Sequence, residues 1–322
     1  MTTTTTTTNL IAEFSDIDEA RFHSDILGSY RPAILRGFVR HWPAVKLAAA
    51  GPQSICQYLI ECDSGHPVDA LLMAPEHKGR LFYRGDMTGF NFARRKLPVA
   101  SVIEQLVRYS QFAQPPSVAV QSALIDDCLP RFARENTAPF LDAAVRPRIW
   151  LGNTITTPAH FDESDNLACV VAGRRRFTLF PPEQVGNLYI GPLDFAPTPT
   201  PISMVDFSAP DFARFPRFRA ALAAAQVADL APGDALYIPT LWWHHVQSQG
   251  VMNILVNYWW TAAGATATIA AMVACMQAMQ ALAPQHRRAW AAMFQHYVFD
   301  AQVDPGAHIA LDARGVLRNA RP

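Results

Sequence analysis

The pattern of hydrophobic and polar positions predicts short β-strands through the middle of the chain and helices near both ends. Short apolar runs rich in β-branched and aromatic residues predict strands, whereas apolar residues spaced three and four apart predict helices. The segments expected to be strands are 31–38, 68–73, 80–84, 117–124, 148–153, 166–171, 175–180, 235–238 and 253–260. The segments expected to be helices are 16–26, 53–61, 99–109, part of 129–140, 268–282 and 285–299.

The order of these elements predicts a mainly β fold. Helices do not alternate with the strands, so a parallel sheet of the α/β type is not expected. Short strands joined by turns, with helices gathered at the two ends, are typical of a double-sheet jelly roll with flanking N-terminal and C-terminal helices. Residues 191–216 contain six prolines and little periodicity. A loop of this length is expected to be functional or packed on the surface.

The composition of the chain suits a large folded core. Half of its 322 residues are hydrophobic and 17% are charged, which argues against disorder. The 27 Lys and Arg residues balance 27 Asp and Glu residues, so no global attraction to nucleic acid or to a membrane surface is expected. Five scattered cysteines without paired metal spacing are typical of a reducing compartment. These features predict a cytoplasmic protein.

Three parts are expected along the chain. Residues 1–9 contain seven consecutive threonines and none of the basic and apolar regions of a secretory signal, so they are expected to form a disordered leader. Residues 10–260 are expected to form the β domain. Residues 261–322 are expected to form a helical extension. Its first part, 261–283, is dominated by Ala, Thr, Met and Gln, whereas a membrane span is normally richer in Leu, Ile, Val and Phe.

Two stretches contain candidate metal ligands: 157–166, with the sequence TPAHFDESDN, and 232–245, with the sequence PGDALYIPTLWWHH. Residues two apart on a strand point to the same face, so His160 and Asp162 would project together. A histidine from the second stretch would complete a set of two histidines and one carboxylate. That set leaves coordination positions open and is typical of non-haem Fe(II) oxygenases.

The second histidine could be His244 or His245. Neighbouring residues on a strand face opposite sides, so only one of them can point at the metal. A zinc or manganese cupin is a competing interpretation. Such sites commonly use three histidines and a glutamate, whereas here an aspartate follows His160 at a spacing of two, which favours iron.

Arg175 is a candidate anion-binding residue. It lies in an arginine triplet, 174–176, and such triplets usually form a solvated face. Strand alternation, however, places Arg175 on the same side as Phe177 and Leu179, so it points inward if those residues are core. An inward arginine requires an anion.

Taken with GRRRF at 173–177, LFPPEQ at 179–184 and the connecting segment 205–216, these stretches resemble the cupin-like JmjC family. Within that family they resemble the asparaginyl hydroxylase that modifies hypoxia-inducible factor. The resemblance runs from about residue 31 to residue 260, with several separate motifs in the same order and at comparable spacing. It implies a double-stranded β-helix fold, bound Fe(II), and 2-oxoglutarate and O2 as cosubstrates.

The resemblance also implies roles for individual residues, and it selects His244 over His245. The positions that match the iron ligands are His160, Asp162 and His244, and the positions that match the cosubstrate pocket are Thr157, Asn166, Arg175 and Asn257. Arg175 stands where the hydroxylase has a lysine. Arginine can bind a carboxylate through two parallel hydrogen bonds, whereas lysine acts as a point charge. The two asparagines could instead satisfy buried backbone groups.

One departure from the family pattern affects the cosubstrate pocket. The hydroxylase has a tyrosine that contacts the cosubstrate on the strand before the metal motif. The aligned stretch here, 118–121 with the sequence VAVQ, offers no hydroxyl group. Gln121 or another residue is therefore expected to contribute to the pocket.

The function implied by the resemblance is an Fe(II)- and 2-oxoglutarate-dependent oxygenase that hydroxylates a protein or peptide side chain. The relative dimerises through helices in the place of 268–299, so a homodimer is expected, although these helices could instead pack on their own domain. Alternative substrates are a small molecule, such as an amino acid derivative, or a modified tRNA base, which the neutral charge disfavours. A non-catalytic binding module is a further alternative, and the complete ligand set argues against it.

Overall fold

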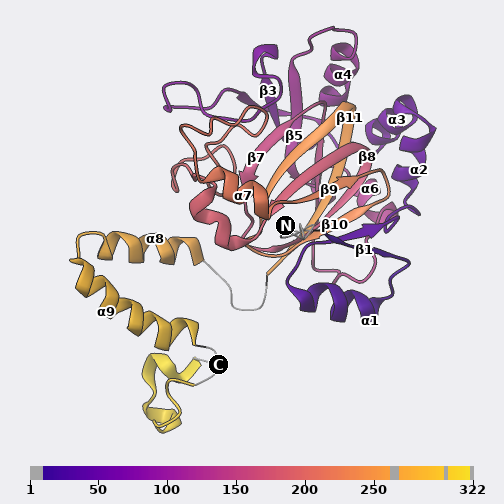
Figure 1. The fold of residues 1–322 in the computed structure, drawn as a ribbon. Helices are drawn as coiled ribbons and strands as arrows, with labels where there is room; N and C mark the ends of the chain where they lie inside the picture. Colours follow the sequence, from indigo (N-terminus) through magenta and orange to yellow (C-terminus); the bar gives the residue numbers. More distant parts are fainter. Residues whose placement is uncertain (1–9, 262–267, 301–303, 320–322) are drawn as a thin grey trace, which may run out of the picture. The chain divides into compact units, whose positions relative to one another are not determined.

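The computed structural model describes residues 10–261, 268–300 and 304–319 (Figure 1). The leader expected at residues 1–9 lies outside the described residues. The chain divides into two compact units, Met1–Ala262 and Ala263–Pro322, which are described separately below.

The first unit is organised around one large, mostly antiparallel sheet (Figure 1). Its strand order is β1-β2-β10-β8-β11-β6-β5-β3-β4, while β7 pairs with β11 and β9 pairs with β8. The strands are β1 Ala12–Ser15, β2 Ala33–Arg36, β3 Val68–Met73, β4 Ala93–Leu97, β5 Ser117–Leu124, β6 Pro147–Gly152, β7 Thr156–His160, β8 Asp165–Phe180, β9 Gln226–Leu230, β10 Ala235–Ile238 and β11 Trp243–Trp260. The expected mainly β, cupin-like jelly roll is confirmed.

Two long strands, β8 and β11, pair antiparallel along most of their length, from Trp243 opposite Phe180 to Trp260 opposite Asp165. The first part of β11 also pairs with β7, and its later part pairs with β6. The sequence analysis divided β8 into two strands and recognised only the later part of β11 as a strand. The gap between the two predicted parts of β8 contains Gly173, whose φ angle is 74°. The predicted part of β11 begins after Gly250, whose φ angle is 100°.

Strand β8 is buried on both of its faces over residues 166–172. Leu167, Cys169 and Val171 belong to the larger hydrophobic core, whereas Ala168 and Val170 belong to a second core. A strand covered on both sides requires apolar residues at every position rather than at alternate ones. This explains the continuous apolar run LACVVA in the sequence.

Helices join the larger core (Figure 1). They are the π-helix Phe22–Ile26, which continues α1 Glu19–Arg21, and α2 Pro43–Ala50, α3 Pro52–Cys62, α4 Val99–Tyr109, α5 Ile125–Cys128 and α6 Pro130–Glu135. A further helix, α7 Phe218–Ala224, contacts the 3-10 helix Pro182–Asn187. The helix expected at 16–26 begins at Glu19 because the Asp18 side chain caps it by accepting from Arg21 N at 2.8 Å. The hydrophobic pattern did not predict α2, α5, α7, β1, β4 or β9.

The prediction of a strand at 80–84 is wrong. This segment makes only isolated bridges, from Arg80 to Thr156 and from Tyr83 to Phe90. Leu81 N donates to Thr156 O on β7 at 3.0 Å. The ladder does not continue, because Phe82 N donates to Asn91 Oδ1 at 2.9 Å and Arg80 O accepts from Asn91 Nδ2 at 2.8 Å. The apolar pattern there reflects buried Leu81 and Tyr83 rather than a sheet position.

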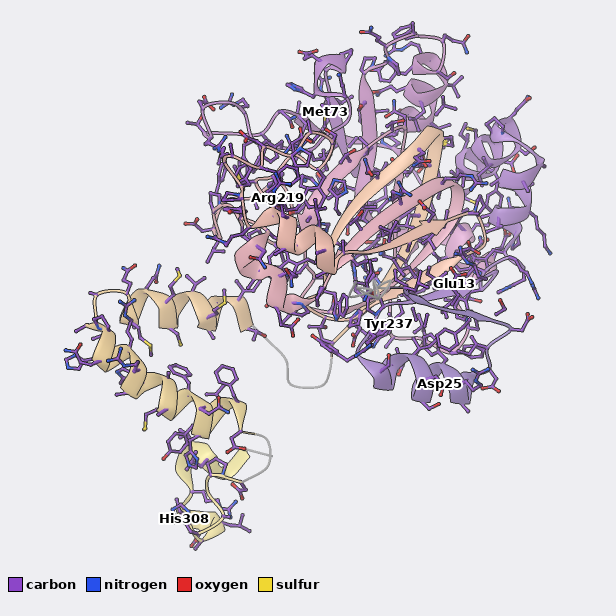
Figure 2. The ribbon with its side chains drawn as sticks, in the orientation of Figure 1. Glu13, Asp25, Met73, Arg219, Tyr237 and His308 are labelled. Carbon is purple, nitrogen blue, oxygen red and sulfur yellow. The ribbon has the colours of Figure 1, made fainter. Side chains whose placement is uncertain are left out.

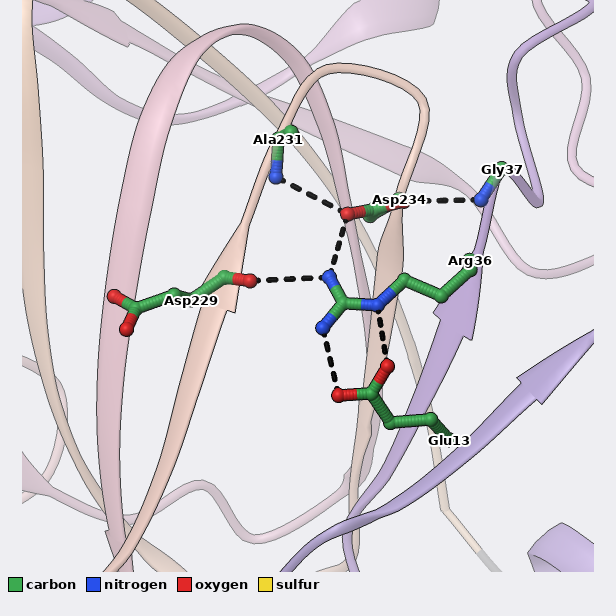
Figure 3. Close-up of polar contacts among 6 residues, drawn as sticks. All are labelled: Glu13, Arg36, Gly37, Asp229, Ala231 and Asp234. Atoms are coloured by element: carbon green, nitrogen blue, oxygen red, sulfur yellow. Dashed lines mark hydrogen bonds and ion pairs between the residues drawn. The ribbon is translucent and has the colours of Figure 1, made fainter.

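A polar cluster explains the Gly233-Asp234 motif (Figure 3). Asp234 accepts hydrogen bonds from Gly37 N at 3.0 Å, Ala231 N at 3.1 Å and Arg36 Nη1 at 2.8 Å. Arg36 also donates to both carboxylate oxygens of Glu13, at 2.7 and 2.8 Å, and thereby lowers the pKa of Glu13. The cluster ties β1 and β2 to the turn before β10, so this motif is structural.

Strand β10 precedes the loop that leads to His244 on β11. Tyr237, labelled in Figure 2, is buried, and its hydroxyl group donates to Asp165 Oδ1 at 2.9 Å. The same oxygen accepts from Thr240 N at 3.2 Å. Asp165 begins β8, so these bonds anchor the loop that precedes β11 to the segment after β7.

The second unit contains α8 Thr268–Met279 and α9 Pro284–Phe294, followed by a π-helix over Gln295–Phe299. Both helices expected from the sequence in this region are present within the described residues. Neither α8 nor α9 has a buried residue. None of the described helices combines the length and the apolar character needed to cross a membrane.

Candidate metal centre and cosubstrate pocket

The structure brings His160, Asp162 and His244 together. His160 ends β7 and lies opposite His244 on β11, and Asp162 follows β7 by two residues. One ligand atom from each residue can be chosen so that all three lie within 4.8 Å of one another. Both histidines are buried, while Asp162 is partly exposed. The arrangement fits a metal ion held on one face by two imidazoles and a carboxylate.

Backbone carbonyls orient the two histidines. His160 Nδ1 lies 2.9 Å from Pro158 O, and His244 Nδ1 lies 3.0 Å from Trp242 O. A carbonyl only accepts, so each Nδ1 carries the proton and each Nε2 lone pair is left for a metal. Burial and the neighbouring His244 hold the pKa of His160 well below its ordinary value. His160 is therefore neutral, as a metal ligand must be.

A chain of side chains orients Asp162. Its Oδ2 accepts from Asn166 Nδ2 at 3.0 Å and from Trp259 Nε1 at 3.1 Å. Asn257 Nδ2 in turn donates to Asn166 Oδ1 at 2.6 Å. The two asparagines thus orient the Asp162 side chain rather than satisfy backbone groups. The sequence analysis missed Trp259, although strand alternation from Asn257 would have placed it on the same face.

We expect Asn166→Ala to weaken metal binding about 10- to 100-fold, because partners that orient a metal ligand typically contribute that much. Titration of the folded protein with Co(II) or Mn(II) measures the effect. Asn187→Ala is a matched control, because Asn187 bonds to Gln184 in a separate 3-10 helix. Equal affinities in the two variants would contradict a positioning role for Asn166.

The three ligands lie in a cavity of about 720 Å³, called here the metal cavity. All of the site residues predicted from the sequence line it. Its lining includes Thr157, His160, Asp162, Asn166, Arg175, His244 and Asn257, with apolar walls from Phe177, Val246 and Leu255. Residues 196–200 of the long proline-rich loop form another wall. Thr200 Oγ1 donates to Phe161 O at 2.5 Å, which anchors this loop beside the ligands.

Arg175 reaches the metal cavity without an acidic partner among the described residues. Its Nε atom is buried and has no hydrogen-bond partner. Arg176 faces the other way and pairs with Asp229 at 2.9 and 2.8 Å, as strand alternation predicts. Burial lowers the pKa of Arg175 to about 10, so the side chain is still charged at neutral pH. An uncompensated charge in a cavity fits an anionic ligand.

Two further donors in the metal cavity lack partners. Gln121 Nε2 and Trp150 Nε1 are buried and unbonded, and both residues line the cavity together with Arg175 and Thr157. A carboxylate offers about four lone-pair sites, so it could accept from several of these donors. The pocket therefore fits the distal carboxylate of 2-oxoglutarate.

The structure also shows the surroundings of Ala119, in the stretch 118–121 that aligns with the cosubstrate-binding tyrosine of the hydroxylase. Ala119 lies opposite Gly152 on the neighbouring strand, and a cavity of about 30 Å³ lies beside this pair. Trp150 lines both this small cavity and the metal cavity, as Gln121 does. The sequence analysis expected Gln121 here and missed Trp150. The alternation of Arg148, Trp150 and Gly152 on β6 was the signal that pointed to it.

The chain belongs to the cupin-like domain family, whose model matches residues 19–266. It is 28% identical over 248 residues to Jumonji C domain-containing protein 5 of Drosophila melanogaster, covering 74% of this chain and 57% of that protein. It is 28% identical over 269 residues to the human bifunctional peptidase and (3S)-lysyl hydroxylase JMJD7, covering 74% of this chain and 80% of that protein. It is 34% identical over 149 residues to human HSPB1-associated protein 1, covering 44% and 30%.

These relatives confirm the JmjC part of the resemblance. The finer resemblance to the asparaginyl hydroxylase stays a prediction from the motifs. The chain spans little more than half of the Drosophila protein and less than a third of the HSPB1-associated protein. What those whole proteins do is therefore considered below only as support for a proposal.

Proposed function

We propose that the protein is an Fe(II)- and 2-oxoglutarate-dependent oxygenase that hydroxylates a protein or peptide side chain. The observation that carries the proposal is the shared cavity of the His160, Asp162 and His244 set and the unpaired Arg175. Three protein ligands leave positions open for a chelating 2-oxo acid and for O2. A relative named as a lysyl hydroxylase supports a polypeptide substrate.

The residues of the chain have distinct roles in this proposal. His160, Asp162 and His244 hold the metal, while Arg175 and Thr157 bind the distal carboxylate of the cosubstrate. When bound, iron and 2-oxoglutarate supply the chemistry that transfers one oxygen atom of O2 to a C–H bond and the other to succinate, with release of CO2. The apolar walls, Phe177, Val246 and Leu255, contact the carbon atoms of the cosubstrate.

The proposal is tested by succinate formation from 2-oxoglutarate after anaerobic reconstitution of the full chain with Fe(II) and exposure to air. We expect turnover in the native chain and none in His160→Ala. Addition of peptide pools should increase turnover and yield a peptide that has gained one oxygen atom. Absence of turnover together with absence of metal and 2-oxoglutarate binding would overturn the oxygenase. Turnover that only small molecules stimulate would overturn the polypeptide substrate.

We also propose that a second copy of the chain covers the helices of the second unit. Met272, Met276 and Trp290 are 51%, 49% and 47% exposed, which is unusual for large apolar side chains on two successive helices. Sedimentation equilibrium tests this: a dimer is expected for the full chain, and a monomer at micromolar concentration would contradict it.

A further inference from the structure

A second large cavity, called here the outer cavity, lies on the opposite face of β7 and β11 from the metal cavity. Its volume is about 1060 Å³. Successive residues of the two strands alternate between the cavities: Thr157, His244 and Val246 line the metal cavity, whereas Thr156, His245 and Gln247 line the outer cavity. Strand alternation therefore makes this a separate site rather than an extension of the first.

His245 presents an unpartnered polar ring to the outer cavity. The residue is 4% exposed, and no described residue forms a hydrogen bond with its side chain. Its ring stacks on Phe207 with centroids 4.4 Å apart and an interplanar angle of 11°. A neutral imidazole ring offers one hydrogen-bond donor and one acceptor. No hydrogen bond within the described fold occupies these two groups, so they can bind a ligand in the outer cavity.

Arg80 is the second group in the outer cavity whose bonding capacity is largely unused. Its guanidinium lies over the Phe82 ring at 3.8 Å from the centroid. Its ion pair with Asp206 spans 3.5 Å, and its hydrogen bond to Val205 O spans 3.4 Å, so both contacts are long. The other oxygen of Asp206 accepts from Ser208 N at 2.9 Å and Ser208 Oγ at 2.6 Å. A guanidinium has five N–H donors, most of which stay available.

The remaining lining of the outer cavity adds positive charge and aromatic surface. Lys78, Arg80 and Arg84 are cationic, while Glu76 and Asp206 are acidic, so three cations face two carboxylates. Arg84 has a weak partner in Asp86 at 3.7 Å. The aromatic residues of the lining are Phe82, Tyr83, Phe90 and Phe92. Cationic hydrogen-bond donors beside aromatic side chains are typical of a binding site for an organic anion.

We propose that the outer cavity binds an organic oxyanion, meaning a phosphate or carboxylate group carried on an apolar or aromatic body. Arg80 and His245 contact the oxyanion, and the aromatic lining contacts the body. The volume is far larger than a bare oxyanion requires, because cavities of roughly 300 to 1,000 Å³ hold whole small molecules. The proposal does not depend on the oxygenase function. It adds a ligand site directly behind the strands that supply the metal ligands.

The test is calorimetric titration of the full chain with phenyl phosphate and with phenylacetate, which distinguishes a phosphate from a carboxylate ligand. Inorganic phosphate is the probe without an aromatic body and should bind at least tenfold more weakly than the better aromatic probe. All titrations are repeated in Arg175→Met, which removes the anion-binding residue of the metal cavity. We expect the affinity for the better aromatic probe to be unchanged in that variant.

Variants of the outer cavity complete the test. We expect Arg80→Gln to weaken binding at least tenfold, and His245→Phe, which keeps the ring stacked on Phe207, to weaken it severalfold. Arg80→Lys keeps the charge and should bind with intermediate affinity, which separates ligand contact from loss of folding. Arg95→Gln is the control, because Arg95 is exposed on β4 and does not line the cavity. Binding of neither probe, unchanged affinity in folded Arg80→Gln, or loss of binding in Arg175→Met would overturn the proposal.

Discussion

We expect His244→Ala to lose metal binding and its oxygenase turnover to fall to the level of the metal-free protein. Only His160 and Asp162 would remain as ligands, and two ligands cannot hold the metal on one face with the other positions open. His244 is 3% exposed and its Nδ1 atom contacts Trp242 O, while its Nε2 atom lies 3.7 Å from Asp162 Oδ2 within the ligand set. Metal content after dialysis, followed by succinate release, measures both effects.

His245→Gln is the informative comparison for this prediction. His245 follows His244 directly but lines the outer cavity, so its replacement should leave metal content unchanged. Circular dichroism and the thermal midpoint verify that both variants are folded. If His245→Gln lost the metal while His244→Ala retained it, the assignment of the third ligand would be reversed.

Arg175→Met should have opposite effects on ligand binding and on stability. Loss of the guanidinium removes a charged partner of the cosubstrate carboxylate, which typically costs about 2 to 5 kcal/mol, or a rise in Kd of about 30-fold or more. The protein without cosubstrate should nevertheless unfold at an equal or higher temperature. The reason is that the substitution removes a buried charge that has no acidic partner among the described residues.

Two other arginine variants control this prediction. Arg175→Lys keeps the charge but not the bidentate geometry, so its affinity for 2-oxoglutarate should be intermediate. Arg176→Met removes the neighbouring arginine, whose partner is Asp229 on β9, and should leave affinity unchanged. Anaerobic titration of 2-oxoglutarate into the Mn(II)-loaded protein measures the affinities. An affinity of Arg175→Met equal to that of the native chain would show that the cosubstrate carboxylate binds elsewhere.

The sequence by itself determined the features that depend on local geometry. Strand alternation separates His244 from His245, because neighbouring side chains of a strand point to opposite faces. It also predicts that His160 and Asp162 lie together, and they do, although Asp162 lies two residues beyond the end of β7. The same rule separates Arg175 from Arg176. The order of apolar segments determined the jelly roll and most of its strands, because a strand that contributes to a core must carry apolar residues in a recognisable pattern.

The tertiary structure decided the features that depend on residues far apart in the chain. The Asn91 side chain bonds Phe82 N and Arg80 O, so the 80–84 segment makes only isolated bridges, although its apolar pattern predicts a strand. The unsatisfied donors of Gln121 and Trp150 converge with Arg175 only when β5, β6 and β8 are assembled around one cavity. Whether a buried polar group finds a partner is a property of three-dimensional packing. Periodicity in a single sequence carries no record of it, and for that reason the outer cavity could not be predicted from the sequence.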